Sequence, residues 1–158
     1  ALALLDEELR PEVRHQCGER TLDIARAAYD EHGVAVELMP FIDDMATAYA
    51  WADLVICRAG ALTIAELCAV GVPALFVPYP AAVDDHQTAN ARPLVDAGAA
   101  LIVPESELTA TYLADVLRDW LQSRAALQQR AIRARGLAQP DALDRITEIC
   151  LEQAGAFA

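Results

Sequence analysis

The sequence predicts an α/β fold, in which a parallel β-sheet carries helices on both of its faces. Helix-like and strand-like segments alternate along most of the chain, as in proteins built from βα units. The strand-like segments are short apolar runs, which suit strands buried on both faces of a parallel sheet. Glycines follow several helix-like segments, at the position where a left-handed residue ends a helix. These three features indicate one domain with right-handed crossovers.

The expected elements follow one another in a regular order. Residues 1–9 are rich in Ala, Leu and Glu and are expected to form a helix, although no capping residue precedes them. Residues 12–16 are then expected to form a strand. Further helices are expected at 19–32, 43–51, 62–70, about 86–97, about 108–122, 124–135 and 141–153, and further strands at 34–38, 54–57, 74–77 and 99–103. Three of the helices end at a glycine: Gly33, Gly71 and Gly98.

Composition limits the classes of function. The chain has 158 residues, of which 55% are hydrophobic and 23% charged, so it can bury a core and is not expected to be disordered. The formal net charge of −12 excludes binding to nucleic acid or to an anionic membrane through bulk electrostatics. No apolar run approaches the roughly 18 residues of a membrane span. A soluble protein is therefore expected.

Cysteine and histidine form no recognisable metal or redox motif. The four cysteines have no C-x-x-C pair and no zinc-ligand spacing, which favours a reducing compartment. The three histidines are scattered. His15 and Cys17 are close in sequence, but nothing supplies the oxyanion site and the third group that a cysteine nucleophile needs. We therefore expect no metal and no cofactor.

The carboxyl ends of parallel strands are where ligands bind, which makes the loops 39–44, 58–62 and 78–87 the candidate site. In the second of these loops, Gly60 permits a tight turn from strand to helix. Such a turn exposes backbone N–H groups at the positive end of a helix dipole, and this arrangement binds phosphate. The sequence therefore predicts a pocket for a sugar nucleotide.

Two charged residues flank this turn, and each has two interpretations. Glu66 lies one turn into the helix, where its carboxylate could accept hydrogen bonds from a ribose diol. Thr63 and Glu66 also fit the T-x-x-E pattern of a capping box, in which Glu66 has no ligand role. Arg58 ends the preceding strand and is expected either to bind a phosphate or to pair with a carboxylate of the protein.

The loop 39–44 has the same kind of ambiguity. Phe41 and Ile42 are candidates to line a base pocket, where the backbone N–H and C=O of Ile42 would read the edge of a uracil. The alternative is a strand end followed by Asp43 as the cap of the helix that runs to Trp51.

The loop 78–87 leads into the first turn of the helix 86–97. There Gln87 offers donors and an acceptor for sugar hydroxyls, and His86 offers a polar ring. The alternative is capping of this helix by Asp84 or Asp85, with His86 and Gln87 solvated beside it.

Several runs of residues, in order and at regular spacing, carry a family resemblance. The chain resembles the bacterial N-acetylglucosaminyltransferases of peptidoglycan synthesis, the MurG type, which have the GT-B fold. The matching runs are His15-Gln16-Cys17-Gly18, Phe41-Ile42-Asp43-Asp44-Met45, Ala48-Tyr49-Ala50-Trp51-Ala52-Asp53, Arg58-Ala59-Gly60-Ala61-Leu62-Thr63 with Glu66, Gly71-Val72-Pro73-Ala74-Leu75-Phe76-Val77-Pro78, and Asp85-His86-Gln87 with Asn90-Ala91.

The resemblance implies that residues 1–158 form the Rossmann-like, C-terminal donor-binding half of such an enzyme. These inverting hexosyltransferases move N-acetylglucosamine from UDP-N-acetylglucosamine to lipid I, giving lipid II for the cell wall that sets cell shape and is remade at division. They act in the cytoplasm as peripheral proteins at the inner face of the plasma membrane. They need no bound metal, because a helix dipole and N–H groups stabilise the leaving diphosphate.

Site roles also follow from the resemblance. By similarity, Ile42 meets the uracil through its backbone, Glu66 binds the ribose hydroxyls, and Gln87, with His86, binds the donor sugar. The diphosphate and ribose region is expected to be held by Ala61, Leu62, Thr63, Ile64 and Ala65.

The chain also departs from the family pattern. The family's amino-terminal domain, which binds the lipid acceptor and is thought to provide the general base, is expected to be absent from residues 1–158. So are the first strand of the donor domain and its Gly-Gly-Ser loop, expected just before Ala1. Because that strand is central in the sheet, its neighbours are expected to lose their pairing, and the chain alone is expected not to catalyse transfer. Ala59 stands where some relatives have Ser.

Three other functions remain compatible with the sequence. The chain could be a non-catalytic UDP-sugar-binding subunit of a two-chain glycosyltransferase, or part of a GT-B glycolipid synthase with another acceptor. It could also be an α/β domain that binds a different nucleotide, although no G-x-G-x-x-G is present to indicate a dinucleotide site.

Overall fold

The computed structural model describes residues 1–81 and 85–155, and it confirms an α/β architecture built on parallel strands. The strands are β1 (Arg14–Gln16), β2 (Glu37–Met39), β3 (Val55–Cys57), β4 (Ala74–Phe76) and β5 (Ala100–Ile102). The α-helices are α1 (Leu22–Glu31), α2 (Met45–Trp51), α3 (Ala61–Val70), α4 (His86–Asp96), α5 (Ala110–Leu121), α6 (Arg124–Arg135) and α7 (Ala142–Gly155). The 3₁₀ turns named among the described residues are η1 (Leu2–Leu4), η2 (Glu7–Leu9), η3 (Glu19–Thr21) and η5 (Glu105–Glu107).

The described strands form two separate parallel sheets. In one, β1 pairs with β2, with Arg14 opposite Glu37. In the other, the order is β3-β4-β5, with Val55 opposite Ala74 and Ala74 opposite Ala100. No ladder joins β1 to β3 among the described residues. The parallel strands are therefore divided between two sheets, and the interruption falls between β1 and β3.

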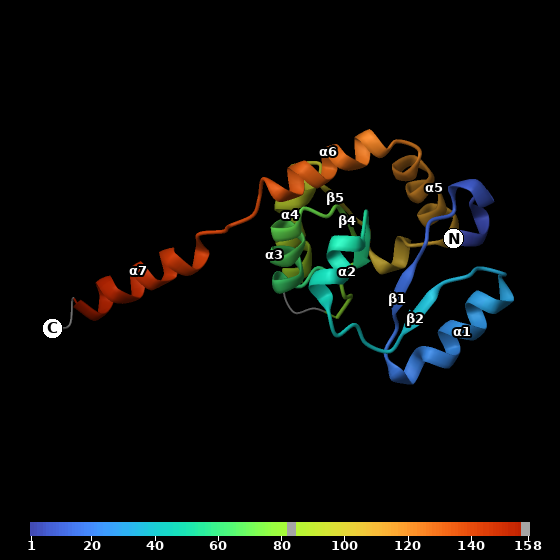
Figure 1. Ribbon diagram of the computed structural model, residues 1–158, viewed down its shortest axis with the longest axis horizontal. Coiled ribbons are helices and arrows are strands. Elements are labelled where there is room, and N and C mark those ends of the chain that lie inside the picture. Colours follow the sequence, from blue (N-terminus) through green and yellow to red (C-terminus); the bar gives the residue numbers. More distant parts are fainter. Residues whose placement is uncertain (82–84, 156–158) are drawn as a thin grey trace.

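The main core lies around the three-stranded sheet. Strand β4 is buried along its whole length, because apolar side chains cover both of its faces. Leu67 and Cys68 on α3, Leu94 on α4 and Ala134 on α6 pack in the same cluster. In Figure 1 the helices α3, α4 and α6 gather around β4 and β5, whereas α1 lies beside β1 and β2.

Short polar residues set the ends of several helices. The side chains of Thr109 and Ser123 accept hydrogen bonds from backbone N–H groups in the first turns of α5 and α6. Gly71 ends α3 in the left-handed conformation, with φ of 82°, as expected from the sequence. A side chain there would also be crowded, because an added Cβ would lie 3.0 Å from the Cβ of Arg135 on α6.

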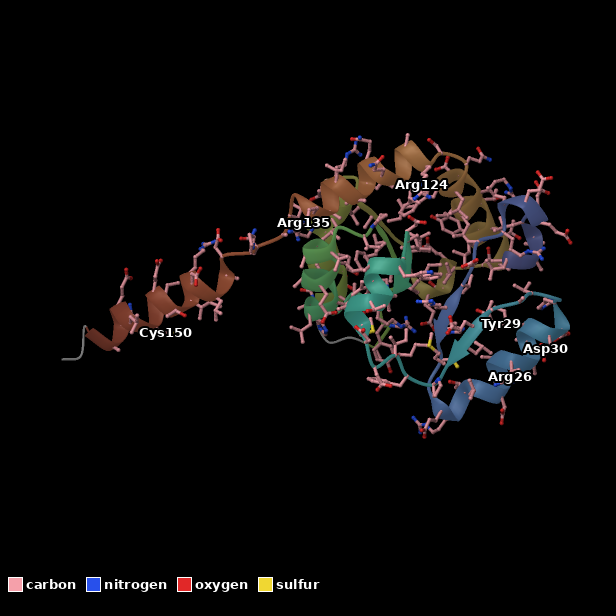
Figure 2. The ribbon with its side chains drawn as sticks, in the orientation of Figure 1. Arg26, Tyr29, Asp30, Arg124, Arg135 and Cys150 are labelled. Atoms are coloured by element: carbon pink, nitrogen blue, oxygen red, sulfur yellow. The ribbon has the colours of Figure 1, made fainter. Side chains whose placement is uncertain are left out.

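Helix α7 extends away from the rest of the described chain, and none of its residues is buried (Figure 1). Its apolar side chains include Leu143, Ile146 and Ile149, all of them more than half exposed. In Figure 2 Cys150 lies on this helix, far from the other labelled side chains. None of the described helices is long and apolar enough to cross a membrane.

Three boundary predictions were wrong. Residues 1–9 form the turns η1 and η2 in place of a helix, because Leu5 between them is extended and packs against Ala114 and Leu117 of α5. The second strand begins at Glu37 and not at residue 34, because the N–H of Val34 still bonds to the end of α1.

The third wrong prediction concerns the cap of α2. Asp44, and not Asp43, caps this helix, with Oδ1 accepting from the N–H of Thr47 at 3.0 Å. A hydrogen bond from the Thr47 hydroxyl to Oδ2 and, after it, the bond from the Thr47 N–H hold the pKa of the Asp44 carboxyl below its ordinary value.

Candidate functional site

The expected site residues gather at one edge of the fold, past the carboxyl ends of the strands. The loop after β2 carries Ile42, the turn after β3 carries Arg58 and the start of α3, and the loop after β4 leads to Gln87. Hydrogen bonds join most of these segments to one another. This is the edge where a parallel α/β sheet binds its ligands.

The amino end of α3 presents unpaired backbone donors, as helix N-termini do. Gly60 is the N-cap residue, and no side chain caps this helix. The first backbone hydrogen bond of the helix is donated by the N–H of Ile64 to the C=O of Gly60, at 3.0 Å. The N–H groups of the residues before Ile64 therefore have no partner within the helix. Leu62 in the first turn is 80% exposed, so solvent reaches this end. The arrangement suits an anion.

The expected conformational role of Gly60 was wrong. Its φ of −67° and ψ of 146° are open to any residue, so the turn does not need glycine for its backbone. A Cβ added there would meet only the hydroxyl of Thr63, at 3.6 Å. What glycine supplies at this position is space in front of the α3 amino end.

Glu66 is held by a neighbouring helix, and the capping-box interpretation was wrong. Thr63 is the third residue of α3 and Glu66 the sixth, so neither stands at the cap. The phenol of Tyr49, on α2, donates a hydrogen bond to Oε2 of Glu66 at 3.2 Å. Tyr49 is only 7% exposed, whereas Glu66 is exposed. The carboxylate therefore rests on a buried donor and faces solvent.

The phenol of Tyr49 stays protonated at neutral pH. Burial and, after it, the negative charge of Glu66 raise its pKa to about 12. Cys57, at the end of β3, adds a smaller effect on the Tyr49 pKa, and burial raises the pKa of the Cys57 thiol itself to about 12. This cysteine is therefore a neutral thiol and not an activated nucleophile.

Arg58 forms an ion pair with a carboxylate of the protein, which was one of its two expected roles. Its Nη2 lies 2.6 Å from Oε2 of Glu105, in η5 after β5. Its Nη1 donates to the carbonyls of Val77 and Pro78, at 3.1 and 2.9 Å. The guanidinium also lies 5.6 Å from the centre of the Tyr79 ring. Arg58 thus ties together the chain segments that leave β3, β4 and β5.

Gln87 and Asn90, both on α4, fix the turn after β3. The side-chain oxygen of Gln87 accepts hydrogen bonds from the N–H groups of Ala59 and Tyr79, at 3.3 and 2.8 Å. The side-chain amide of Asn90 donates to the C=O of Ala59 at 3.3 Å. Since Gln87 uses its oxygen on the backbone, its NH₂ group is the part suited to a ligand.

The remaining residues of this loop are placed only in part. His86 is the first residue of α4 and is exposed. Asp85 is the N-cap, with a left-handed φ of 52°; its side chain makes no cap hydrogen bond but accepts one from Thr88 at 2.6 Å. Asp84, the other expected capping residue, lies outside the described residues.

Ile42 lies where the resemblance places the base, but its N–H is engaged. It donates to the side-chain oxygen of Gln16, at the end of β1, at 2.9 Å. Phe41 beside it is 65% exposed, as a side chain that covers a ligand would be. A uracil that bonded to this N–H would have to displace the amide of Gln16.

Sequence reasoning missed three residues that organise this edge: Gln16, Tyr49 and Glu105. Of these three, only Tyr49 could have been singled out from the sequence. It stands between Ala48 and Ala50 in an apolar helix, and a buried tyrosine hydroxyl needs a partner. The partners of Gln16 and Glu105 lie 26 and 47 residues away in sequence and follow from the tertiary fold alone.

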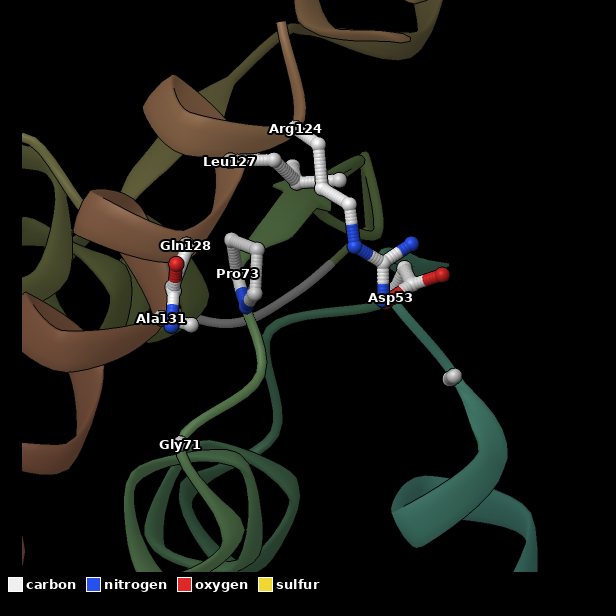
Figure 3. Close-up of a pocket in the computed structure, with 8 residues that line it drawn as sticks. Asp53, Gly71, Pro73, Arg124, Leu127, Gln128 and Ala131 are labelled. Atoms are coloured by element: carbon white, nitrogen blue, oxygen red, sulfur yellow. The ribbon is translucent and has the colours of Figure 1, made fainter.

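A pocket on the opposite edge does not belong to this site. Figure 3 shows Asp53 and Arg124 facing each other beside Pro73, with α6 on one side, and the ion pair they form spans 3.9 Å. Asp53 and Pro73 precede β3 and β4, so the pocket lies at the amino ends of the strands. A second hollow, between α1 and β2, is lined by Arg26, Tyr29 and Asp30 (Figure 2). Within residues 1–81 and 85–155, no group of His, Cys, Asp or Glu side chains is arranged so that it could bind a metal ion.

Comparison with known families accounts for this arrangement. The model of the glycosyltransferase family 28 C-terminal domain matches residues 2–146, which is most of the chain. The chain belongs to this family. As a family 28 domain it shares the Rossmann-like GT-B architecture, and the resemblance drawn from its motifs is confirmed.

Curated relatives are similar to this family 28 domain over nearly its whole length. Proteins named UDP-N-acetylglucosamine–N-acetylmuramyl-(pentapeptide) pyrophosphoryl-undecaprenol N-acetylglucosamine transferase are 62% identical in Alkalilimnicola ehrlichii and 56% identical in Marinobacter nauticus. Each alignment covers 98% of this chain, but only 43% and 42% of the respective relative. The chain therefore spans less than half the length of these relatives.

Solved structures agree with this placement. The crystal structure of Acinetobacter baumannii MurG is 42% identical and superposes with a TM-score of 0.87, covering 96% of this chain and 45% of that one. The glycosyltransferase VinC, solved in complex with DTDP, superposes with a TM-score of 0.62 at 22% identity, covering 85% of this chain and 31% of that one. The second likeness concerns the fold alone.

Proposed function

We propose that this chain is the donor-binding domain of a transferase that moves N-acetylglucosamine from UDP-N-acetylglucosamine to lipid I. The observation that carries the proposal is the pairing of an open α3 amino end with an exposed carboxylate, Glu66, one helical turn further on. A diphosphate needs an anion site, and the ribose diol attached to it is suited to a carboxylate acceptor nearby. The activity named for the 62% identical relative supports the choice of donor and acceptor.

The proposed donor lies along the carboxyl edge of the strands. Its uracil meets the backbone of Ile42, after displacing the amide of Gln16, and Phe41 covers the base. Its diphosphate is bound by the first-turn N–H groups of α3, from Ala61, Leu62 and Thr63, with Ile64 and Ala65 behind them. Its ribose hydroxyls bond to Glu66. The sugar hydroxyls meet the NH₂ group of Gln87 and the ring of His86.

Arg58 does not bind the donor in this proposal. Its guanidinium is already engaged by the carboxylate of Glu105 and by the carbonyls of Val77 and Pro78. It would have to break an ion pair of 2.6 Å to reach a phosphate. We therefore place Arg58 in the framework that holds the loop after β4.

The chemistry we propose is one direct displacement with inversion. An acceptor hydroxyl attacks the anomeric carbon, the bond from that carbon to the diphosphate oxygen breaks, and a base takes the hydroxyl proton. As this bond breaks, negative charge grows on UDP, where the N–H groups and the dipole of α3 stabilise it. The part of the relatives that this chain does not span is proposed to bind lipid I and to supply the base.

The proposed roles of the donor-binding and acceptor-binding parts also suggest where the enzyme works in the cell. The enzyme would work as a peripheral protein at the inner face of the bacterial plasma membrane, where lipid I is held. With a net charge of −12, this domain is repelled by an anionic bilayer. We therefore propose that it faces away from the membrane and that the acceptor-binding part makes the contact.

Saturation-transfer NMR with UDP-N-acetylglucosamine tests donor binding, with a circular dichroism spectrum of the same sample as the control for folding. Saturation of both the uracil and the N-acetyl protons is the expected result. A folded chain that transfers saturation to neither group would contradict the proposed donor site. GDP-mannose, which lacks both groups, serves as the matched control ligand.

A chimaera tests the reaction and separates the alternatives. In it, this chain replaces the matching part of the Alkalilimnicola ehrlichii relative. The chimaera is expected to convert lipid I to lipid II, whereas the chain alone is expected to bind donor without transfer. Transfer to a glycolipid acceptor but not to lipid I would favour a glycolipid synthase. Donor binding with an inactive chimaera would favour a separate binding subunit.

A further inference from the structure

We propose that Tyr49 is a positioning residue that orients the carboxylate of Glu66 toward the ribose and thereby sets the preference of this site for ribonucleotides. The inference rests on the proposed function, because it assigns a ribose to Glu66. It adds a residue that makes no contact with the donor and acts only through a second side chain.

The first support is the contrast in burial between the two partners. Tyr49 is 7% exposed and belongs to the main core cluster, so its ring is fixed by packing. Glu66 is exposed on α3 and has a flexible side chain with three rotatable bonds. The hydrogen bond of 3.2 Å between them joins a fixed donor to a mobile acceptor. Tyr49 therefore restricts where the carboxylate can lie.

The second support is the hydrogen-bonding capacity of the carboxylate. Two carboxylate oxygens offer about four acceptor sites, and the phenol takes one of them on Oε2. Enough capacity remains for two ribose hydroxyls at once. A carboxylate held in place before the ligand arrives loses less conformational entropy on binding, and this gain appears as affinity.

The third support is the protonation state of the phenol. Because burial and Glu66 raise the pKa of Tyr49 to about 12, the hydroxyl keeps the proton that it donates to Glu66 at neutral pH. Tyr49 also reaches Glu66 from α2, the helix that directly follows the loop bearing Ile42. Its position links the base end of the site to the ribose end.

The experiment compares UDP with 2′-deoxy-UDP by titration calorimetry on the full chain. The variants are Tyr49→Phe, Glu66→Ala and the double variant, with Tyr112→Phe on α5 as the control for loss of a tyrosine hydroxyl elsewhere in the chain. Tyr49→Phe is expected to weaken UDP about fivefold, the effect of one lost hydrogen bond, and 2′-deoxy-UDP less than twofold. In the Glu66→Ala background, which leaves the phenol of Tyr49 no side chain to orient, the same substitution is expected to change neither affinity by more than about twofold.

The outcomes separate this inference from the function on which it rests. A wild-type chain that does not bind UDP would overturn both. Wild-type binding with an equal loss for the two nucleotides in Tyr49→Phe, or with no loss, would overturn the positioning role alone. A second measurement needs no variant: ¹³C NMR of ring-labelled tyrosine is expected to show a larger shift of the Tyr49 signal with UDP than with 2′-deoxy-UDP. Equal shifts would contradict the inference.

Discussion

Replacing Arg58 by Ala separates the two roles that its sequence position allows. The ion pair with Glu105 joins side chains that are 47% and 50% exposed, and such a pair contributes about 0.5 kcal/mol. The two hydrogen bonds to the carbonyls of Val77 and Pro78 are charge-assisted but partly solvated, at about 1 kcal/mol each. The substitution is therefore expected to lower the free energy of unfolding by about 2.5 kcal/mol, or roughly 5–10 °C in melting temperature for a chain of this size.

Glu105→Ala provides the control for Arg58→Ala. It removes the ion pair and leaves both carbonyl contacts, so it is expected to cost only about 0.5 kcal/mol. Thermal and urea unfolding followed by circular dichroism measure both variants, and calorimetry with UDP-N-acetylglucosamine measures their affinity. If Arg58→Ala kept wild-type stability but lost donor affinity, the framework role would be refuted and a phosphate contact favoured.

Four other predictions follow from the structure. Glu66→Ala is expected to weaken UDP-N-acetylglucosamine binding by about 1–3 kcal/mol in calorimetry, and unchanged affinity would remove its ribose role. Gly60→Ala is expected to change the free energy of unfolding by less than about 0.5 kcal/mol, because the lower conformational entropy of the unfolded chain offsets the poorer N-cap. The same substitution is expected to weaken donor binding in calorimetry, because the added Cβ fills the space in front of the α3 amino end. Gly71→Ala, with φ of 82° and a Cβ only 3.0 Å from Arg135, is expected to cost about 2 kcal/mol in urea unfolding. Because the folded-state pKa of Tyr49 is raised, its contribution to stability is complete below pH 10 and is expected to be lost between pH 10 and about 12, and Tyr49→Phe should flatten the unfolding free energy over that range.

Local rules were enough for most of the elements. Gly71 ended α3 as expected, and α6 occupies the residues that its composition predicted. Prediction from sequence failed where a tertiary contact outweighed local preference. Leu5 is extended because it packs on α5, so the helix-favouring residues around it form only short turns.

The site was predictable in its chemistry and less so in its contacts. The strand-turn-helix at Arg58–Glu66 could be placed because a parallel sheet brings the carboxyl ends of its strands together. Which carboxylate would meet Arg58 could not be known, since Glu105 is 47 residues away. Likewise, a T-x-x-E pattern does not show whether the glutamate faces its own helix or Tyr49 of another.

The break between the two sheets gives the domain two units that should open separately. The unit of β1, β2 and α1 has few buried side chains, and none in α1, whereas β4 and its neighbours hold the main core. Amide protons in the first unit are therefore expected to exchange with deuterium through local opening, and those of β4 only through global unfolding. Ile42 follows the weaker unit and Glu66 belongs to the stronger one. A nucleotide that contacts both units would stabilise them against separate opening and so slow amide exchange in β2. Donor binding would then make the two units unfold cooperatively, although no strand pairing joins their sheets.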